Sequence, residues 1–255
     1  MPGASGLAPL AGSPGACVPP LDLAPALVRS FSLLDRRAHA LFASGRARTG
    51  GATLLLVAYD ERGWLWTANA GDCKAVLSSL GAPAPLNSCH NPDDPAERDR
   101  VREAGAGMVS PDFLVGGDLN VCRSLGDFDL GPPLKFWDGA RGEARGALAA
   151  APDVRVRRLE GRDEFFVAAT DGVWDYYGGE GSVITDARRA LRSRPRDAQA
   201  CAEAVVGEAE RRQRALLHRG THGDNATVAV LSFRELPSIP RHSASRLNLR
   251  SARQR

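Results

Sequence analysis

The 255-residue sequence has no uninterrupted apolar stretch that approaches the roughly 20 residues needed to span a bilayer. Its start also lacks the basic segment followed by an apolar segment that marks a secretory signal. These two absences argue against a membrane protein and against secretion. We therefore expect a soluble, intracellular chain, cytoplasmic or nuclear, with no membrane partner.

Cysteine is scarce and irregularly spaced. The five cysteines are an odd number, lie far apart and include no C-x-x-C pair. This spacing argues against both a disulfide framework and a thiolate zinc site. The expected alternative is a set of free thiols in a reducing compartment.

The charge balance is also unremarkable for a globular protein. A formal net charge of +3, with 43% hydrophobic and 25% charged residues, is too mild to imply nucleic-acid binding. We therefore expect no nucleic-acid partner.

Composition divides the chain into three parts. Residues 1–20 are rich in Gly, Pro, Ala and Ser, carry no charged side chain and are expected to stay unfolded. Residues 237–255 form a basic tail, expected to be flexible. The segment between them, residues 21–236, is expected to form the folded domain.

The folded segment shows helices and strands in separate groups. Apolar residues at Leu27, Phe31, Leu34, Ala38, Leu41 and Phe42 predict one buried face of a helix over residues 23–42. Strands are predicted over residues 52–60, 63–71, 74–81, 119–122, 165–169 and 227–233. This order favours an antiparallel α+β arrangement over alternating parallel units.

Two further helices are predicted from their start signals. Asp94 is a good N-cap, Pro95 suits the first helical position, Glu97 can reach back as in a capping box, and Gly105 ends the helix. Asp197 begins the other helix, whose apolar pattern continues to Leu217.

Two aspartates border predicted buried strands. Asp171, followed by Gly172, comes just after the strand at residues 165–169, and Asp224 comes just before the strand at residues 227–233. If these strands are antiparallel neighbours, both carboxylates meet at one edge of the sheet. Hard divalent cations such as Mg²⁺ and Mn²⁺ prefer clustered carboxylate oxygens. For either aspartate alone, an ordinary turn residue is the competing interpretation.

A third candidate is Asp127, which follows Gly126 after the predicted strand at residues 119–122. Asp129, two residues further on, competes with it for the same role.

A series of segments resembles the metal-dependent protein serine/threonine phosphatases of type 2C, the PPM family. The segments occur in the family's order between about residue 23 and residue 233: "ANAGDCKAVL", "HNPDDPAERDRVREAGAGMV", "LNVCRSLGD", "APDVRV", "AATDGVWDYY" and "GDNATVAVLSF". The resemblance implies a four-layer α-β-β-α sandwich of two antiparallel sheets flanked by helices. It also implies a monomer that acts on phosphoprotein substrates.

The resemblance further implies a site for Mg²⁺ or Mn²⁺. In such enzymes two metal ions activate a water that attacks phosphorus directly. Asp171 and Asp224 match two metal-ligand aspartates of the family, and Asp127 matches a position that helps to hold a further, more weakly bound ion. Beside these aspartates, Gly172 is expected to serve the turn and Trp174 to pack in the core behind the site.

The chain also departs from the family pattern. It lacks the family's N-terminal phosphate-binding arginine, its acidic metal-binding pair and its Asp-Gly-His-Gly-Gly segment, whose aspartate bridges both metals. Asp60 follows an apolar strand but lies at the next hairpin turn, so it does not replace that aspartate. Cys89 stands where an aspartate is usual.

Loop histidines are a weak substitute for the missing ligands, and His90, His218 and His222 are expected to be exposed and without a metal-binding role. Two interpretations therefore remain for function. The chain is either an incomplete part of an active phosphatase or a catalytically impaired pseudophosphatase that acts as a protein-binding module. A third interpretation is that the chain folds poorly because strands of its core are missing.

Overall fold

The computed structural model describes residues 22–106, 108–110, 113–114, 119–216, 223–233 and 251–252. The boundaries predicted at residues 20/21 and 236/237 lie outside these ranges, as do His218 and His222. The described residues divide into two compact units. The first unit lies within residues 22–57, 66–72 and 88–156, and the second lies within residues 58–65, 73–87 and 157–252. No helix in the described part of the chain is both long enough and apolar enough to cross a membrane.

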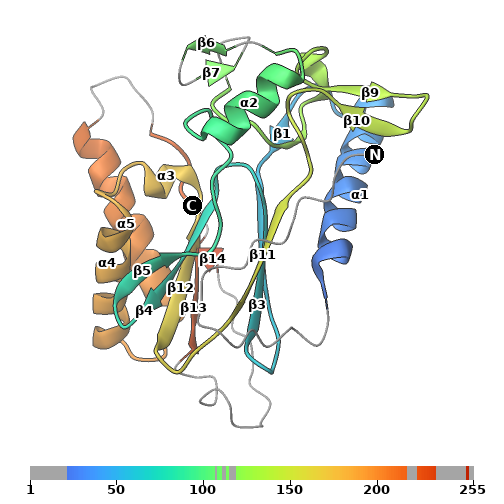
Figure 1. The fold of residues 1–255 in the computed structure, drawn as a ribbon. Helices are drawn as coiled ribbons and strands as arrows, with labels where there is room; N and C mark the ends of the chain where they lie inside the picture. The colour runs from blue at the N-terminus through green and yellow to red at the C-terminus, as the bar shows by residue number, and fades with distance from the viewer. Residues whose placement is uncertain are drawn as a thin grey trace. The chain divides into compact units, whose positions relative to one another are not determined.

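The second unit is built on a five-stranded sheet in the order β14-β13-β12-β4-β5, in which every neighbouring pair is antiparallel (Figure 1). Its strands are β4 (Lys74–Ser79), β5 (Ala82–Pro85), β12 (Asp163–Ala169), β13 (Val228–Ser232) and β14 (Ser251–Ala252). Its helices are α3 (Asp171–Trp174), α4 (Glu180–Ser193) and α5 (Ala198–Leu216).

Helices α4 and α5 lie side by side along this sheet and share its hydrophobic core (Figure 1). In α4, Val183, Ile184, Ala187 and Leu191 are buried, a spacing that places them on one helical face. The predicted helix from Asp197 is confirmed as α5, and the Asp197 carboxylate accepts a hydrogen bond from the backbone N–H of Ala200 (2.8 Å). Helix α4 was not predicted.

The first unit contains helix α1, helix α2 and several short strands. Its elements are α1 (Ala24–Ala43), β1 (Gly51–Ala52), α2 (Pro95–Glu103), β6 (Met108–Ser110), β7 (Phe113–Leu114), β8 (Leu125–Gly126), the 3₁₀ helix η1 (Phe128–Leu130), β9 (Phe136–Asp138) and β10 (Glu143–Arg145). Most residues of β2 (Leu54–Tyr59), β3 (Trp64–Ala70) and β11 (Asp153–Arg158) also fall within the ranges of the first unit, and these strands form a three-stranded sheet in the order β11-β3-β2.

The α+β class with antiparallel sheets is confirmed, and so are most of the predicted elements. The turn between β2 and β3 is held by Asp60, whose carboxylate accepts hydrogen bonds from the backbone N–H groups of Arg62 and Trp64 (3.0 and 2.8 Å). Asp60 is therefore a turn residue, as predicted. In α2, Asp94 caps the helix by accepting from the N–H of Ala96 (2.9 Å), and Gly105 follows the helix with φ +83°.

Three predictions of local structure are wrong. Residues 119–122 form no strand; the short strand β8 begins later, at Leu125. Glu97 makes no capping box, because its carboxylate instead binds Arg100 and Arg123. The buried face of α1 consists of Leu27, Phe31 and Asp35, whereas Leu34 and Leu41 are exposed. A helical pattern alone does not say which stripe a neighbouring element will cover.

Candidate functional site

The register of β12 and β13 brings two of the predicted site residues to one edge of the sheet. The strands are antiparallel neighbours, and the last pair of the ladder is Ala169 with Val228. Asp171 begins α3 directly beyond β12, and Asp224 precedes β13. The predicted meeting of these two residues at one edge of the sheet is therefore confirmed.

Hydrogen bonds beyond the ladder hold the two segments together. The backbone N–H of Thr170 donates to the carbonyl of Thr227 (3.2 Å), and the N–H of Thr227 donates to the Thr170 hydroxyl (3.1 Å). That hydroxyl in turn donates to the carbonyl of Asn225 (3.3 Å). Gly172 packs so closely that a Cβ there would lie 2.4 Å from the Asn225 carbonyl oxygen. The residues beside both aspartates are thus fixed relative to one another.

The electrostatics of this edge disfavour the negative charges of Asp171 and Asp175. Burial raises the pKa of Asp171 above its ordinary value, and the nearby carboxylate of Asp224 raises it further. Burial and Asp224 likewise raise the pKa of Asp175, while the ammonium of Lys74 opposes that shift. Each carboxylate also interacts locally: Asp171 accepts a hydrogen bond from the N–H of Gly172 (2.9 Å), and Asp224 accepts one from the N–H of Asn225 (2.7 Å).

Asp175 and Lys74 are members of this site that the sequence prediction missed. Asp175 follows Asp171 by four residues, which is the spacing of one helical turn and is a readable signal. Lys74 is the first residue of β4 and pairs with Ala169 across the ladder, so only the sheet register places it here. Its ammonium lies 3.0 Å from Glu180 Oε1 and 5.8 Å from the centre of the Trp174 ring.

The donor set suits a hard divalent cation. Carboxylate oxygens are the ligands that Mg²⁺ and Mn²⁺ prefer, and a cation between Asp171 and Asp224 would offset their mutual repulsion. Asp224 is exposed and Asp171 is half-buried, which leaves room for the waters that Mg²⁺ retains in protein sites. Among the described residues, no group of three or more His, Cys, Asp or Glu side chains is arranged to hold a metal. Asp171 and Asp224 thus offer a hard cation two carboxylate ligands, and water would have to fill its remaining positions.

Asp127, the third predicted site residue, belongs to the first unit. It follows β8, which pairs with β1, and its backbone is left-handed (φ 59°, ψ 28°). Its carboxylate accepts a hydrogen bond from the Ser124 hydroxyl (2.6 Å), and burial raises its pKa above the ordinary value. Asp129, its competitor in the sequence, instead accepts a hydrogen bond from the N–H of Gly50 (3.4 Å).

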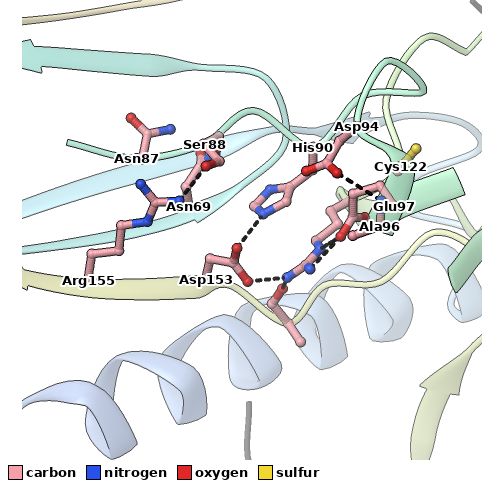
Figure 2. Close-up of polar contacts among 12 residues, drawn as sticks. Asn69, Asn87, Ser88, His90, Asp94, Ala96, Glu97, Cys122, Asp153 and Arg155 are labelled. Carbon is pink, nitrogen blue, oxygen red and sulfur yellow. Dashed lines mark hydrogen bonds and ion pairs between the residues drawn. The ribbon is translucent and has the colours of Figure 1, made fainter. Parts of the chain in front are cut away.

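His90 is buried rather than exposed, contrary to the expectation for a loop histidine. Its Nδ1 accepts a hydrogen bond from the N–H of Gly71 (3.3 Å), so the ring proton of the neutral form resides on Nε2. Nε2 lies 3.1 Å from Asp153 Oδ2 (Figure 2). We interpret His90 as a structural residue that ties its loop to the start of β11.

Asp153 belongs to a charged network that continues to the buried carboxylate of Glu97 (Figure 2). The Arg123 guanidinium lies 2.9 Å from Asp153 Oδ1 and 2.5 Å from Glu97 Oε1, and Arg100 lies 2.7 Å from Glu97 Oε2. Burial alone would raise the pKa of Glu97, but the hydrogen bonds from Arg123 and Arg100 outweigh it and lower that pKa. The network joins α2 to β11 and to the segment before β8.

Comparisons with known proteins point to one family. The family model of protein phosphatase 2C matches residues 19–215. A relative from Oryza sativa subsp. japonica, "Probable protein phosphatase 2C 57", is 34% identical over 86% of this chain and 54% of its own length. A second, "Probable protein phosphatase 2C 22" from Arabidopsis thaliana, is 37% identical over 76% of this chain and 45% of its own length. The chain thus spans about half the length of these relatives.

Solved structures show the same fold. A serine-threonine phosphatase 2C from Toxoplasma gondii superposes with a TM-score of 0.63 at 20% identity, covering 85% of this chain and 72% of that chain. A sex determining protein from C. elegans superposes with a TM-score of 0.68 at 23% identity, covering 85% of this chain and 48% of that chain.

Proposed function

Because the chain belongs to the protein phosphatase 2C family, we propose that it hydrolyses phosphoserine and phosphothreonine esters in protein substrates with the help of Mg²⁺ or Mn²⁺. The observation that carries this proposal is the meeting of Asp171 and Asp224 at one sheet edge, where the pKa of Asp171 is raised by burial and by the charge of Asp224. A divalent cation bound by both carboxylates would replace their mutual repulsion with attraction to the metal.

In this proposal Asp171 and Asp224 hold the cation, and Asp127 helps to hold a further, more weakly bound ion. When bound, the metal would supply a nucleophilic water at neutral pH and neutralise charge on the phosphate. Other residues of the site hold the two carboxylates and helix α3 in place. Thr170 and Thr227 keep the two carboxylates at one edge, and Trp174 anchors α3 by donating its indole N–H to the carbonyls of Ala169 and Lys74 (3.0 and 3.1 Å).

Lys74 has a separate role in the proposal. Its ammonium moderates the charge of Asp175 and pairs with Glu180, the first residue of α4. It therefore favours the ionised form of Asp175, offsets part of the negative charge at this edge, and links β4 to the start of α4. The alternative of a protein-binding module without catalysis gains no support from the relatives, which bear the names of phosphatases.

We also propose an intracellular location, cytoplasmic or nuclear. Among the described cysteines, Cys122 and Cys201 are buried free thiols, which suits a reducing compartment. Burial raises the pKa of Cys122 to about 11 and that of Cys201 to about 12, so these two thiols are unreactive. Fluorescence microscopy of a tagged chain would test the location, and an extracellular or membrane signal would contradict it.

The direct test is hydrolysis by the purified chain of a phosphothreonine peptide and of p-nitrophenyl phosphate, with Mn²⁺ and with a chelator. We expect turnover with Mn²⁺ only, and a loss of at least about 100-fold in Asp171→Ala and in Asp224→Ala, because even outer-shell changes cost 10–100-fold at metal sites. Asp99→Ala, an exposed aspartate on α2, is the matched control. A folded chain without Mn²⁺-dependent turnover would overturn the proposal.

A further inference from the structure

Helix α1 buries a charged residue on its apolar face. Its three buried residues, Leu27, Phe31 and Asp35, follow one another at intervals of four and therefore share one side of the helix. Asp35 is only 3% exposed, and its partner Lys135, from the segment before β9, is fully buried. A buried ion pair is a weak source of stability, because desolvation of both charges offsets their attraction. The role of the Asp35–Lys135 pair is therefore sought in its hydrogen bonds to the neighbouring backbone.

Those contacts fall on both sides of a single residue, Leu125. The Lys135 ammonium lies 2.9 Å from Asp35 Oδ1 and donates a second hydrogen bond to the carbonyl of Ser124 (2.7 Å). The same Asp35 oxygen accepts a hydrogen bond from the backbone N–H of Gly126 (2.8 Å). The pair thus binds the backbone just before and just after Leu125, at strand β8.

The backbone that the pair holds leads directly into Asp127. Gly126 and Asp127 both have positive φ, 80° and 59°; this left-handed backbone is uncommon outside glycine, although aspartate adopts it more readily than most residues. The N–H of Asp127 donates to the carbonyl of Gly50 (2.9 Å), and the Ser124 hydroxyl donates to Asp127 Oδ2 (2.6 Å). The direction of the carboxylate is therefore set by the segment from Ser124 to Asp127.

The backbone at Gly50 and Gly51 packs closely against Gly126 and the Asp127 carboxylate. A Cβ atom added to Gly51 would lie 2.1 Å from Asp127 Oδ2, and one added to Gly126 would lie 2.7 Å from the Gly50 carbonyl oxygen. The Asp127 carboxylate therefore occupies the space that a side chain at position 51 would need.

We propose that Asp35 and Lys135 are positioning residues, which set the direction of the Asp127 carboxylate through Ser124 and Gly126 without touching a metal ion themselves. This inference rests on the proposed function, because it gives Asp127 the task of helping to hold the more weakly bound ion. It goes beyond that function by assigning a role to a buried pair on α1 and before β9. A pair that only anchored α1 would not affect the behaviour of Asp127.

The test uses the full chain and the double substitution Asp35→Asn/Lys135→Met, which removes both charges and leaves neither uncompensated. Mn²⁺ binding is measured by isothermal titration, and amide hydrogen exchange at Gly126 and Asp127 is measured in metal-free protein by NMR. We expect a thermal midpoint close to that of the wild type, since neutral replacements of buried ion pairs are often tolerated. We also expect the weaker Mn²⁺ site to lose 10–100-fold in affinity, about the cost of outer-shell changes, and both amides to exchange faster.

Three further variants serve as an assignment, a control and a fallback for this test. Asp127→Ala defines which phase of the titration belongs to Asp127. Arg157→Met/Asp163→Asn removes another partly buried ion pair, with a nitrogen–oxygen distance of 3.2 Å, and is expected to leave the titration and both amides unchanged. If the double variant at Asp35 and Lys135 does not fold, Asp35→Glu keeps the charges, displaces the carboxylate by one methylene and is expected to weaken the same Mn²⁺ site.

The outcomes separate this inference from the proposed function. The inference is overturned if the double variant keeps wild-type Mn²⁺ affinity and unchanged amide exchange at Gly126 and Asp127. If only Asp35→Glu folds, an unchanged affinity of its weaker Mn²⁺ site overturns the inference instead. If Asp127→Ala leaves Mn²⁺ binding intact, the proposed metal role of Asp127 fails. Amide exchange then still decides whether the pair positions the turn: faster exchange in the variant supports the positioning, and unchanged exchange overturns it.

Discussion

Asp171 and Asp224 lie at the same edge of the β12–β13 ladder, because Ala169 pairs with Val228 and both aspartates lie just beyond that pair. The neighbouring residues Thr170 and Thr227 continue the connection with two hydrogen bonds. Two acidic side chains are thereby held close together, in a place where burial already disfavours the charge of Asp171. The stability of this edge should therefore depend on whether a cation is present.

Mn²⁺ is expected to raise the thermal midpoint of the wild-type chain. A ligand that binds only the folded state stabilises it by about 2.7 kcal/mol at 100 times its dissociation constant. Asp224→Asn should abolish most of this shift, because it removes a negative ligand from an edge with few protein ligands. Differential scanning fluorimetry with and without Mn²⁺ measures both effects. Asp99→Asn serves as the control, and a full Mn²⁺ shift in Asp224→Asn would refute the assignment.

Asp171→Asn is expected to have the opposite effect without metal. In the presence of a chelator it should stabilise the chain by up to about 1 kcal/mol, because it removes a charge that burial and Asp224 disfavour. The asparagine side-chain oxygen can still accept the hydrogen bond from the N–H of Gly172. Urea unfolding in chelator provides the measurement. A loss of metal-free stability would show that the Asp171 charge is stabilised by contacts other than those described.

Gly172→Ala is expected to disturb both stability and metal binding. The new methyl group would lie 2.4 Å from the Asn225 carbonyl oxygen and 3.0 Å from its carbonyl carbon, both backbone atoms, so one of the two segments must move. We expect a loss of about 1–3 kcal/mol, typical of overpacking, and a smaller Mn²⁺ shift in the thermal midpoint.

Gly181→Ala is the matched control for this substitution. Gly181 lies in α4, and a Cβ atom added there would meet no atom within 4 Å, so alanine should stabilise the helix by roughly 0.5–1 kcal/mol. Equal stability and equal Mn²⁺ response in the two variants would contradict the close approach of Gly172 to Asn225.

The Asp153 network predicts a specific dependence of stability on pH. Hydrogen bonding from His90, together with the charge of Arg123, lowers the pKa of Asp153 to about 2, from an ordinary value of 3.8. A lowered carboxyl pKa contributes stability that is complete above pH 3.8 and is lost as the pH falls through about 2. Because the Asp153 side chain is 37% exposed, we expect this contribution to stay below about 1 kcal/mol.

Comparison with Asp153→Asn isolates that contribution. The wild type should be more stable than the variant near neutral pH, and the difference in unfolding free energy should shrink between about pH 4 and pH 2. Urea unfolding at a series of pH values measures it. A difference that stays constant over this interval would mean that the ionisation of Asp153 does not contribute.

Much of the candidate site could be predicted from the sequence because its signals are local. A buried strand followed by Asp-Gly, and an Asp-Asn pair followed by another strand, mark Asp171 and Asp224 without knowledge of the fold. Asp60 is likewise assigned to a turn by its neighbours, and its carboxylate indeed accepts two backbone hydrogen bonds there. Where a residue's role depends on its immediate neighbours, the sequence is sufficient.

Other members of the site depend on contacts between distant segments. Lys74 reaches this edge only because β4 pairs with β12, and His90 is buried because Gly71 and Asp153 contact its two ring nitrogens. Neither pairing leaves a periodic signal in the chain. Leu34 is predicted to be buried and is exposed, since the element that covers α1 meets a different stripe of the helix.

The sequence by itself determined the family and the antiparallel α+β class and marked the acidic residues of the candidate site, because motif order and apolar periodicity are properties of the chain. The tertiary structure alone decided that Asp35 and Lys135 form a buried pair and that this pair binds the backbone on both sides of Leu125. The physical reason is desolvation: a charge can be buried only where folding supplies a partner, and that partner lies far away in the sequence.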